Sequence, residues 1–300
     1  MKNPPANLAQ ALPDTHHTSI IGDYVSLTKP RLNLLVVLTS AAGYYLGASG
    51  TPSLVNMAQA VAGTALVAGG SAVLNQVYER DTDARMRRTR LRPIPDQRVS
   101  PTEATAYGVV LSAAGLSLLA VATNWVAATL ALATLALYLL VYTPMKRTSN
   151  LSTLVGAVPG ALPPVIGWAA SRGDIAIGGW TLFAIVFLWQ IPHFMAIAWM
   201  YRDDYRSAGF PMLPVVEPDG LRTGQQALLY AAALLPVSIG PTVVGITGWA
   251  YFWLALALGV MLLVLSAQFA RSRSDRSART LFFGSIIYLP LIWAIMVLDH

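Results

Sequence analysis

Residues 103–143 have the sequence EATAYGVVLSAAGLSLLAVATNWVAATLALATLALYLLVYT, in which no charged residue follows Glu103. A helix that crosses a bilayer needs about 20 mostly apolar residues, so this run is long enough for two crossings. A turn fits between the two halves only at Thr123–Asn124. The run therefore predicts two transmembrane helices, at approximately 103–123 and 125–143.

The composition extends this membrane character to the whole chain. Of its 300 residues, 55% are hydrophobic and 11% are charged, whereas soluble domains carry about 25% charged residues. Cysteine is absent, which excludes disulfides, zinc–thiolate sites, iron–sulfur clusters and cysteine nucleophiles. Carboxylates, His and Asn remain as metal ligands, so we expect any bound metal to be a hard cation.

Apolar stretches of similar length recur along the sequence, and we expect nine transmembrane helices in an all-α bundle. No repeat or long linker divides them, so residues 23–300 are interpreted as one membrane domain. Residues 1–22 contain several prolines and no apolar run of signal-peptide length, which predicts a disordered cytoplasmic tail. The nine stretches are approximately 33–50, 54–76, 103–123, 125–143, 151–170, 177–200, 225–246, 249–270 and 280–298.

Basic residues fall in alternate loops, and this pattern predicts the orientation of the chain. With nine spans, every Lys and Arg except Arg172 lies on the side of the N-terminus. Short basic loops stay in the cytoplasm, so we expect a cytoplasmic N-terminus. The net charge of +6 therefore indicates membrane topology and not a nucleic-acid partner. Both long loops, roughly 77–102 and 201–224, lie on this side, where we expect the chemistry.

Three polar side chains follow one another at helical spacing near the end of the second predicted span. Asn75, Glu79 and Asp83 are four residues apart and project from one helix face, whereas Asp81 points elsewhere. Two like charges on one face repel, and a bound cation would offset that cost. Carboxylates with a substrate phosphate are the ligands that Mg²⁺ prefers, so we interpret the three residues as a magnesium site. The alternative is a solvated helix end.

Directly after these acids comes a cluster of arginines, Arg85-Met-Arg-Arg-Thr-Arg-Leu-Arg-Pro93. Guanidinium groups bind phosphate oxygens in a bidentate manner. Carboxylates and arginines side by side therefore suggest a diphosphate bridged by metal on one side and held by arginine on the other. The alternative is a topology signal that contacts lipid head groups, which explains the arginines but not the adjoining acids.

Three further segments carry polar residues at or near the membrane. Tyr142-Thr-Pro-Met-Lys146-Arg147 closes the fourth span, and Asp203-Asp204 follows the sixth. His193, in Trp189-Gln-Ile-Pro-His193-Phe, is the only histidine inside a predicted span. Ionisable residues at membrane depth are functional candidates by default; the alternative is a neutral imidazole that a neighbouring helix satisfies.

Together these segments resemble the UbiA-type intramembrane prenyltransferases, over nearly the whole chain from about Asp23 to the C-terminus. Within that superfamily they are most similar to the haem-modifying members. The resemblance rests on Leu27-Thr-Lys-Pro-Arg31, Asn75-Gln, Glu79-Arg-Asp-x-Asp83, Met86, Arg88-Thr, Arg92-Pro, Tyr142-Thr-Pro-Met-Lys146-Arg147, Trp189-Gln-Ile-Pro-His193-Phe, Asp204-Tyr, Ala208-Gly and Pro211-Met-Leu-Pro214.

The resemblance implies a helical bundle around a cavity open to lipid, and a transfer of farnesyl from farnesyl diphosphate to a vinyl group of haem B. The products would be haem O and diphosphate. It implies Mg²⁺ as cofactor and places Tyr142 and His193 among the catalytic residues, with His193 as haem contact or base. The implied metal ligands are Asn75, Glu79, Asp83 and Asp204, and the implied diphosphate-binding residues are Arg88, Arg92, Lys146 and Arg147.

The resemblance also implies a place in the bacterial inner membrane, with the active site facing the cytoplasm. A haem A-forming enzyme or a terminal oxidase is the expected recipient of the product. One departure concerns the second acidic motif, usually two aspartates four apart: here Ser207 follows Asp203 and Ala208 follows Asp204 at that distance. This reduced form favours the haem-modifying members over quinone-pathway enzymes and leaves the number of metal ions open.

Two other functions remain open at this stage. The first is a prenyltransferase of the same fold that acts on an aromatic acid or quinone precursor, in which His193 would have no clear role. The second is a transporter whose carboxylates bind a coupling cation. Transporters bind near the membrane midplane and show repeat symmetry, whereas these carboxylates gather at one rim.

Overall fold

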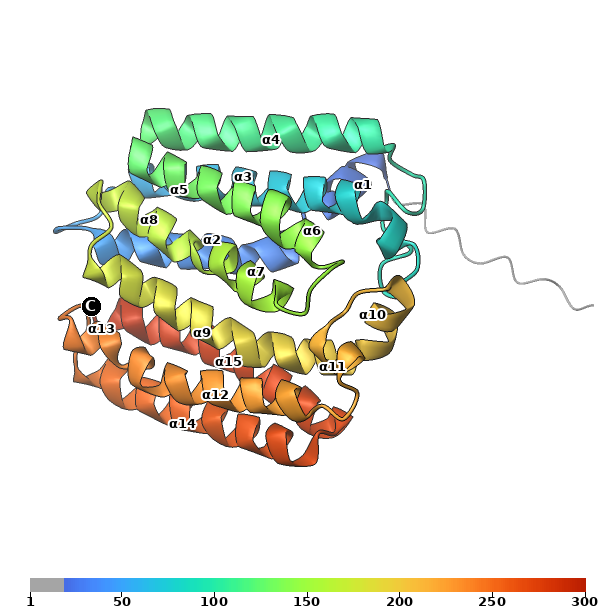
Figure 1. Cartoon of the computed structure of the whole chain (residues 1–300). Helices are drawn as coiled ribbons and strands as arrows, with labels where there is room; N and C mark the ends of the chain where they lie inside the picture. The colour runs from blue at the N-terminus through green and yellow to red at the C-terminus, as the bar shows by residue number, and fades with distance from the viewer. Residues whose placement is uncertain (1–18) are drawn as a thin grey trace, which may run out of the picture.

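The structure, a computed structural model, describes residues 19–300, and in this part of the chain helices are joined by loops, with no strand (Figure 1). The predicted tail at 1–22 lies outside the described residues except for 19–22, of which three belong to α1. The helices are α1 (Ile20–Leu27), α2 (Pro30–Gly47), α3 (Leu54–Asp83), α4 (Pro101–Ala122), α5 (Trp125–Ala136), π-helical η1 (Leu137–Tyr142), α6 (Thr143–Met145), α7 (Ser152–Ala161), α8 (Pro163–Arg172), α9 (Ile177–Met200), α10 (Arg202–Ala208), α11 (Leu213–Val216), α12 (Leu221–Ser238), α13 (Gly240–Val243), α14 (Trp249–Ser272) and α15 (Asp275–Leu298).

Eight helical segments within residues 19–300 are long and apolar enough to cross a membrane. They coincide with eight of the nine predicted stretches. The remaining one corresponds to α2, which has only 18 residues and carries Pro30, Arg31 and Asn33 in its first turn. The predicted count of nine spans is therefore not confirmed, and the side of the membrane that holds the N-terminus stays a prediction. The segments are Leu54–Asp83, Pro101–Ala122, Trp125–Met145, Ser152–Arg172, Ile177–Met200, Leu221–Val243, Trp249–Ser272 and Asp275–Leu298.

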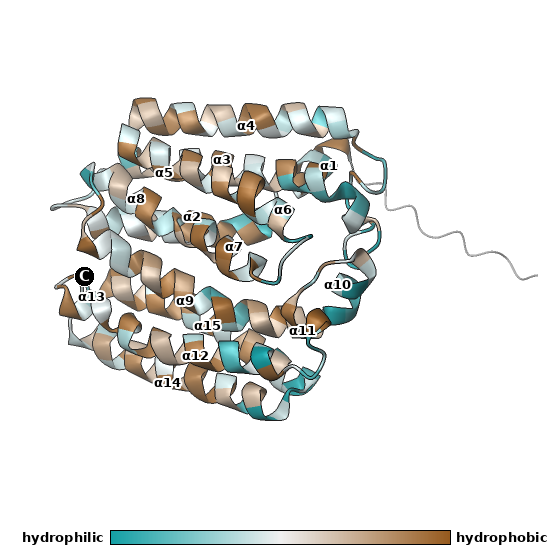
Figure 2. Ribbon diagram, in the orientation of Figure 1, coloured by the Kyte–Doolittle hydropathy of each residue, from teal (hydrophilic) through white to brown (hydrophobic). Residues whose placement is uncertain are grey.

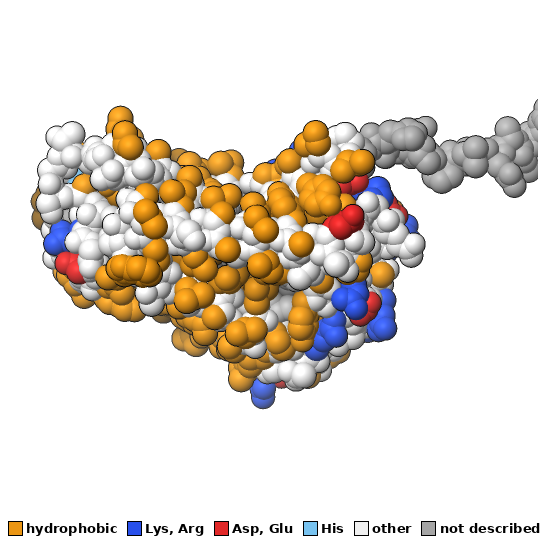
Figure 3. Space-filling view, turned by 90° about the horizontal axis from the view of Figure 1, so that it is seen from above, with side chains coloured by type: hydrophobic (Ala, Val, Ile, Leu, Met, Phe, Trp, Pro, Cys, Tyr) orange, Lys and Arg blue, Asp and Glu red, His pale blue; other side chains and the backbone are white. Residues whose placement is uncertain are grey.

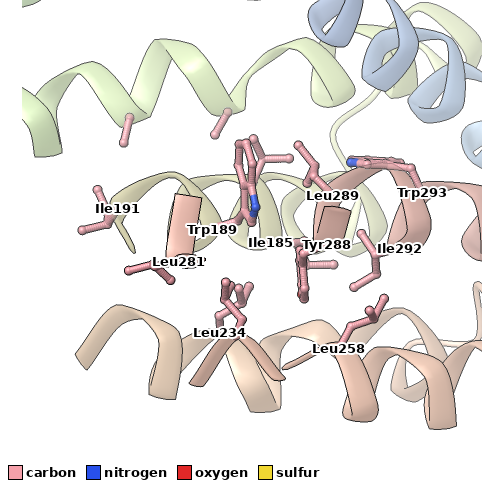
Figure 4. Packing of buried hydrophobic residues seen from close by; sticks show 14 of the residues in the cluster. Ile185, Trp189, Ile191, Leu234, Leu258, Leu281, Tyr288, Leu289, Ile292 and Trp293 are labelled. Atoms are coloured by element: carbon pink, nitrogen blue, oxygen red, sulfur yellow. The ribbon is translucent and has the colours of Figure 1, made fainter. Parts of the chain in front are cut away.

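The largest apolar core lies where α9 packs against α12, α14 and α15 (Figure 4). Ile185 of α9, Tyr288 of α15 and Leu234 of α12 are fully buried there. The only polar atom of the Trp189 side chain, the indole Nε1, donates a hydrogen bond of 2.8 Å to the Ser285 carbonyl oxygen of α15. This bond fixes the register of α9 against α15 at the depth of His193.

Helices α3 and α4 approach each other at glycines, as small residues allow in membrane bundles. A Cβ atom on Gly70 would collide with the Ser112 hydroxyl and lie 2.7 Å from the Gly108 carbonyl oxygen. At the neighbouring Gly69 the nearest atom would be 3.5 Å away, on Thr28, which is an ordinary contact.

We expect Gly70→Ala to destabilise the bundle by about 2 kcal/mol, because the added methyl forces two helix backbones apart. Gly69→Ala is the matched control and should be neutral or slightly stabilising, since alanine is the better helix former. Thermal unfolding of both variants in the same detergent measures the difference. Equal melting temperatures of the two variants would show that α3 and α4 leave room for a methyl group at Gly70.

Hydrophilic residues concentrate at one end of the bundle, where α1, α6, α10 and α11 lie (Figures 1 and 2). On the face drawn in Figure 3, most Lys, Arg, Asp and Glu side chains gather at this same end. We call it the charged end. Its two long loops touch: Met86 packs with Phe210 and Met212, and the Ser207 hydroxyl donates to the Arg85 carbonyl at 3.3 Å. The loops after α3 and after α9 therefore form one layer over the bundle.

Candidate active site

The polar face of helix α3, formed by Asn75, Glu79 and Asp83, lies at the charged end of the bundle. The helix continues without a break to Asp83, so Asn75, Glu79 and Asp83 lie on successive turns. All three are buried, with 1%, 5% and 1% of their surface exposed. Burial of two carboxylates is costly unless each meets a positive charge, and this excludes the solvated helix end considered above.

Each carboxylate of α3 has a basic partner. Lys146 Nζ donates to Glu79 Oε1 at 2.7 Å, and Arg92 Nη1 donates to Asp83 Oδ2 at 2.6 Å. Both bases come from loops at the charged end, Lys146 from the loop after α6 and Arg92 from the loop after α3. The structure thus brings together four of the predicted site residues as two ion pairs, in which the carboxylates are buried and the bases are partly exposed.

Asn75 is held by the helical segment opposite it. The Tyr138 hydroxyl donates to Asn75 Oδ1 at 3.0 Å, and Asn75 Nδ2 donates to Thr143 Oγ1 at 3.3 Å. Tyr138 lies in the π-helix η1, just before Pro144, whose ring and missing N–H disturb regular α-helical bonding. The wider turn, a feature frequent at functional sites, sets Tyr138 and Thr143 on one side, facing α3.

Tyr142, at the end of η1, holds the ammonium group of Lys146 from the other side. Lys146 Nζ lies 4.6 Å from the centre of the Tyr142 ring, a cation–π distance. Burial alone would lower the pKa of Lys146, but the Tyr142 phenol and the Glu79 carboxylate raise that pKa above its usual range. Lys146 therefore carries a fixed positive charge. Gly156 makes room for the ring, because a Cβ there would lie 2.5 Å from it.

Lys29 lies close enough to these charges to interact with them, although no role for it was predicted from the sequence. Burial and the positive charges of Arg92 and Lys146 lower the pKa of Lys29 to about 7, against the opposing effect of Glu79 and Asp83. Its backbone is left-handed, with φ of 50°, a conformation that costs a non-glycine residue about 1 kcal/mol or more. An anion at this site would relieve the repulsion among Lys29, Arg92 and Lys146.

Lys29 and Arg92 also border a cavity of about 570 Å³ beside α1. The signal that could have identified Lys29 is its place in the motif Leu27-Thr-Lys-Pro-Arg31.

The remaining predicted residues lie in the layer of loops above the ion pairs. The Arg88 guanidinium lies 5.4 Å and 5.1 Å from the ring centres of Tyr201 and Tyr205, and so reaches toward the loop after α9. Arg147 is exposed and donates to the Tyr78 carbonyl at 3.2 Å. Asp204 is partly buried in α10, next to the Asp203–Arg206 ion pair. The structure brings neither Arg88 nor Asp204 into direct contact with Glu79 or Asp83.

A metal ion would have to displace or share the ion pairs. Among residues 19–300 no three His, Cys, Asp or Glu side chains are close enough to hold a metal by themselves. One observation nevertheless fits a cation: Asp83 Oδ1 is buried and has no hydrogen-bond partner. A buried carboxylate oxygen normally finds a partner, and Asn75 and Glu79 precede it on the same helix face. The donor set on α3, two carboxylates and an amide, suits a hard cation.

His193 lies apart from this cluster, on α9. It is half-buried; its ring stacks on those of Trp189 and Phe282, and Nδ1 is 2.8 Å from the Ser285 hydroxyl. This confirms that a neighbouring helix, α15, satisfies one nitrogen of the ring. The other nitrogen, Nε2, has no hydrogen-bond partner within the described part of the chain.

Residues 36–288 match the UbiA prenyltransferase family. The chain is 45% identical to a protein named protoheme IX farnesyltransferase from Solibacter usitatus, over 93% of this chain and 98% of that protein. It is 46% identical to the protein of the same name from Opitutus terrae, over 93% and 94%. A mitochondrial protoheme IX farnesyltransferase from Arabidopsis thaliana is 39% identical, over 92% of this chain and 64% of that protein.

Solved structures show the same fold at low sequence identity. A digeranylgeranylglyceryl phosphate synthase superposes with a TM-score of 0.79 at 14% identity, over 94% of this chain and 99% of that chain. A UbiA homologue from Archaeoglobus fulgidus, bound to GPP and Mg²⁺, superposes with a TM-score of 0.62 at 18% identity, over 91% and 99%. The family match, the relatives and this fold agree, and the chain belongs to the UbiA prenyltransferase family.

Proposed function

We propose that this protein transfers the farnesyl group of farnesyl diphosphate to a vinyl group of haem B, and so forms haem O and diphosphate. The observation that carries the proposal is the site on α3, where Asp83 has a buried oxygen without a partner beside two ion pairs. Relatives at 37–46% identity that bear the name protoheme IX farnesyltransferase support the choice of haem as acceptor.

The charged end is suited to hold a diphosphate through a metal ion. Asn75, Glu79 and Asp83 would hold Mg²⁺ from α3, and Asp204 would approach from α10, whose loop already touches the loop after α3. Mg²⁺, once bound, would act as a Lewis acid on the diphosphate leaving group. The carboxylates would then share their negative charge with the cation, which frees the bases for the phosphate oxygens. Those bases are Arg88, Arg92, Lys146 and Arg147.

The residues around the diphosphate favour the first step, in which the bond between farnesyl C1 and oxygen breaks. The electron pair of that bond leaves with the diphosphate, and Lys146 and Arg92 stabilise the added charge because they are already fixed in place. The allylic cation that remains needs a dry environment. The apolar helices of the bundle, with the long isoprenoid tail between them, exclude water from it.

The second step joins the two substrates. The π electrons of the haem vinyl group form the new carbon–carbon bond with farnesyl C1, which leaves a cation on the carbon next to the porphyrin ring. Water adds to that carbon and loses one proton to solvent, so the acceptor gains one farnesyl group and one hydroxyl. His193 would contact the haem during this step.

We place the protein in the bacterial inner membrane, with the charged end toward the cytoplasm. Its basic loops favour this orientation. Both proposed substrates carry long or flat apolar parts, so membrane lipid is the medium from which they enter. A haem A-forming enzyme or a terminal oxidase is the proposed recipient of the product.

Tyr142 is expected to act through its ring. Tyr142→Phe keeps the aromatic face beside Lys146 and should retain transfer within about threefold, whereas Tyr142→Leu removes the cation–π contact and should slow transfer about tenfold. Initial rates with saturating farnesyl diphosphate measure both variants. If Tyr142→Phe is as slow as Tyr142→Leu, the hydroxyl and not the ring is the catalytic group.

Competition between acceptors tests the proposed function. Purified protein is incubated with labelled farnesyl diphosphate, Mg²⁺ and equal amounts of haem B and an aromatic acid, and the label in each acceptor is counted. We expect the label in haem alone. Label in the aromatic acid would move the protein to the quinone-pathway enzymes, and label in neither acceptor would argue against a prenyltransferase.

A further inference from the structure

The environment of His193 determines which of its ring nitrogens carries the proton. The ring lies in nearly parallel planes with Trp189 and Phe282, with centres 4.9 Å and 5.1 Å apart and interplanar angles of 19° and 23°. These two stacking partners, from α9 and α15, leave the ring little freedom to rotate. The orientation of His193 is therefore set by the packing of the bundle.

Ser285, fully buried on α15, supplies the hydrogen-bond partner of the ring. Its Oγ lies 2.8 Å from His193 Nδ1 and 2.7 Å from the Phe282 carbonyl oxygen. A carbonyl oxygen only accepts, so the single hydroxyl proton of Ser285 goes to Phe282. Oγ must then accept from His193, and Nδ1 carries the proton of the neutral imidazole.

The opposite nitrogen, Nε2, consequently has a free lone pair. Nε2 has no hydrogen-bond partner within residues 19–300. It is also not one of the buried side-chain atoms that lack a partner, so it remains accessible. His193 lies seven residues before the end of α9, about 10 Å along the helix axis from the charged end. Asn75 precedes the end of α3 by eight residues, so each side chain lies about two turns from the end of its own helix.

We propose that Ser285 fixes His193 as the Nδ1–H tautomer, and that Nε2 of His193 is an axial ligand to the iron of the haem substrate. This inference rests on the proposed function, because it assigns the residue that receives the haem substrate. Histidines that bind metals usually donate their second ring N–H to a nearby acceptor, the arrangement that Ser285 provides here. Haem iron commonly takes a neutral histidine nitrogen as its axial ligand.

The alternative role, a general base, fits the surroundings less well. A base becomes an imidazolium when it takes a proton, and that charge needs a carboxylate or water beside it. The contacts of His193 in the described chain are the rings of Trp189, Phe194 and Phe282 and the neutral hydroxyl of Ser285. An iron ligand stays neutral, so its role requires no such partner.

The four histidines of the chain allow a clean test, namely His16, His17, His193 and His300. Purified protein is mixed with haem B, without farnesyl diphosphate or Mg²⁺, and resonance Raman spectra of the reduced complex are recorded. A variant that keeps only His193 (His16→Ala, His17→Ala, His300→Ala) should retain the iron–histidine stretch, and heavy-nitrogen histidine should shift it. His193→Ala, with the other three intact, should lose the stretch, and added imidazole should restore it.

Ser285 is a positioning residue in this scheme, so its variants have a separate readout. Ser285→Ala should keep the iron–histidine stretch at a shifted frequency and weaken haem binding about tenfold. Ser285→Thr retains a hydroxyl and should restore both values. A purely structural role would lower the melting temperature of Ser285→Ala without shifting the frequency in the protein that stays folded, and this result would overturn the role of Ser285.

The same preparations separate the inference from the proposed function. If the triple variant forms farnesylated haem but shows no shift with labelled histidine, the iron ligand is not His193 and the inference fails alone. If His193→Ala keeps the stretch while transfer falls, His193 acts on the chemistry and not on the iron. If wild-type protein neither binds haem nor transfers farnesyl, the proposed function fails with it.

Discussion

Asp83→Asn is expected to lower farnesyl transfer by at least about 100-fold and to leave the bundle folded. Asparagine has the same shape but no charge, so it weakens the metal ion that the buried Oδ1 would bind, and the Lewis-acid contribution is worth several kcal/mol. Transfer rates measured over a range of Mg²⁺ concentrations test this. The variant should require more Mg²⁺ for its residual activity than the wild type.

Asp81→Asn is the matched control for this variant. Asp81 lies two residues earlier on the same helix, but its side chain is 67% exposed and pairs with Arg80 at the surface. The control should transfer farnesyl within about twofold of wild type, because surface ion pairs contribute little. Equal activity in the two variants would contradict the placement of the metal site on the Asn75, Glu79 and Asp83 face.

Lys146→Gln is expected to have an effect of similar size, by about 100-fold, for a different reason. Its ammonium group is fixed between Glu79 and the ring of Tyr142, and only 13% of the side chain is exposed. A preorganised charge at the leaving group loses about 3 kcal/mol of transition-state stabilisation when it is removed. The variant should also melt at a lower temperature, since Glu79 is left buried without a partner.

Arg147→Gln separates this effect from a general loss of positive charge. The neighbouring Arg147 is exposed and contacts only the Tyr78 ring and carbonyl among the described residues. Its replacement should slow transfer about tenfold, less than that of Lys146, because an exposed guanidinium contributes less to phosphate binding than a partly buried ammonium does; initial rates at saturating farnesyl diphosphate measure the difference. A larger loss of transfer in Arg147→Gln than in Lys146→Gln would mean that the diphosphate binds at the exposed surface near Arg147 and not at the ion pairs.

The helices themselves could be predicted well from the sequence, because the hydrophobic runs are long and their period is local. Eight of the nine stretches are helices long enough to span. The second helix, α3, runs beyond its predicted stretch at 54–76 and continues to Asp83, through the first part of the predicted loop at 77–102. The predicted count of nine spans is not confirmed, because α2 is not apolar enough to be a candidate span, and the reason is again local. The first turn of α2 holds Arg31 and Asn33, which belong to the rim.

The pairing of charges could not be predicted in the same way, because partners come from distant segments. Glu79 and Lys146 are 67 residues apart, and His193 and Ser285 are 92 apart. The arginine cluster offers several equivalent guanidinium groups, and only the folded loop selects Arg92 for Asp83 and turns Arg88 toward Tyr201 and Tyr205. The role of Lys29 was hidden for the same reason, since its charge matters only beside Arg92 and Lys146.

The most direct test is to incubate the purified protein in lipid with haem B, farnesyl diphosphate and Mg²⁺, and to determine the mass of the extracted haem. We expect a haem heavier by one farnesyl group and one hydroxyl, absent when EDTA is added and restored by excess Mg²⁺. Haem of unchanged mass under all these conditions, from protein that binds both substrates, would contradict farnesyl transfer to haem.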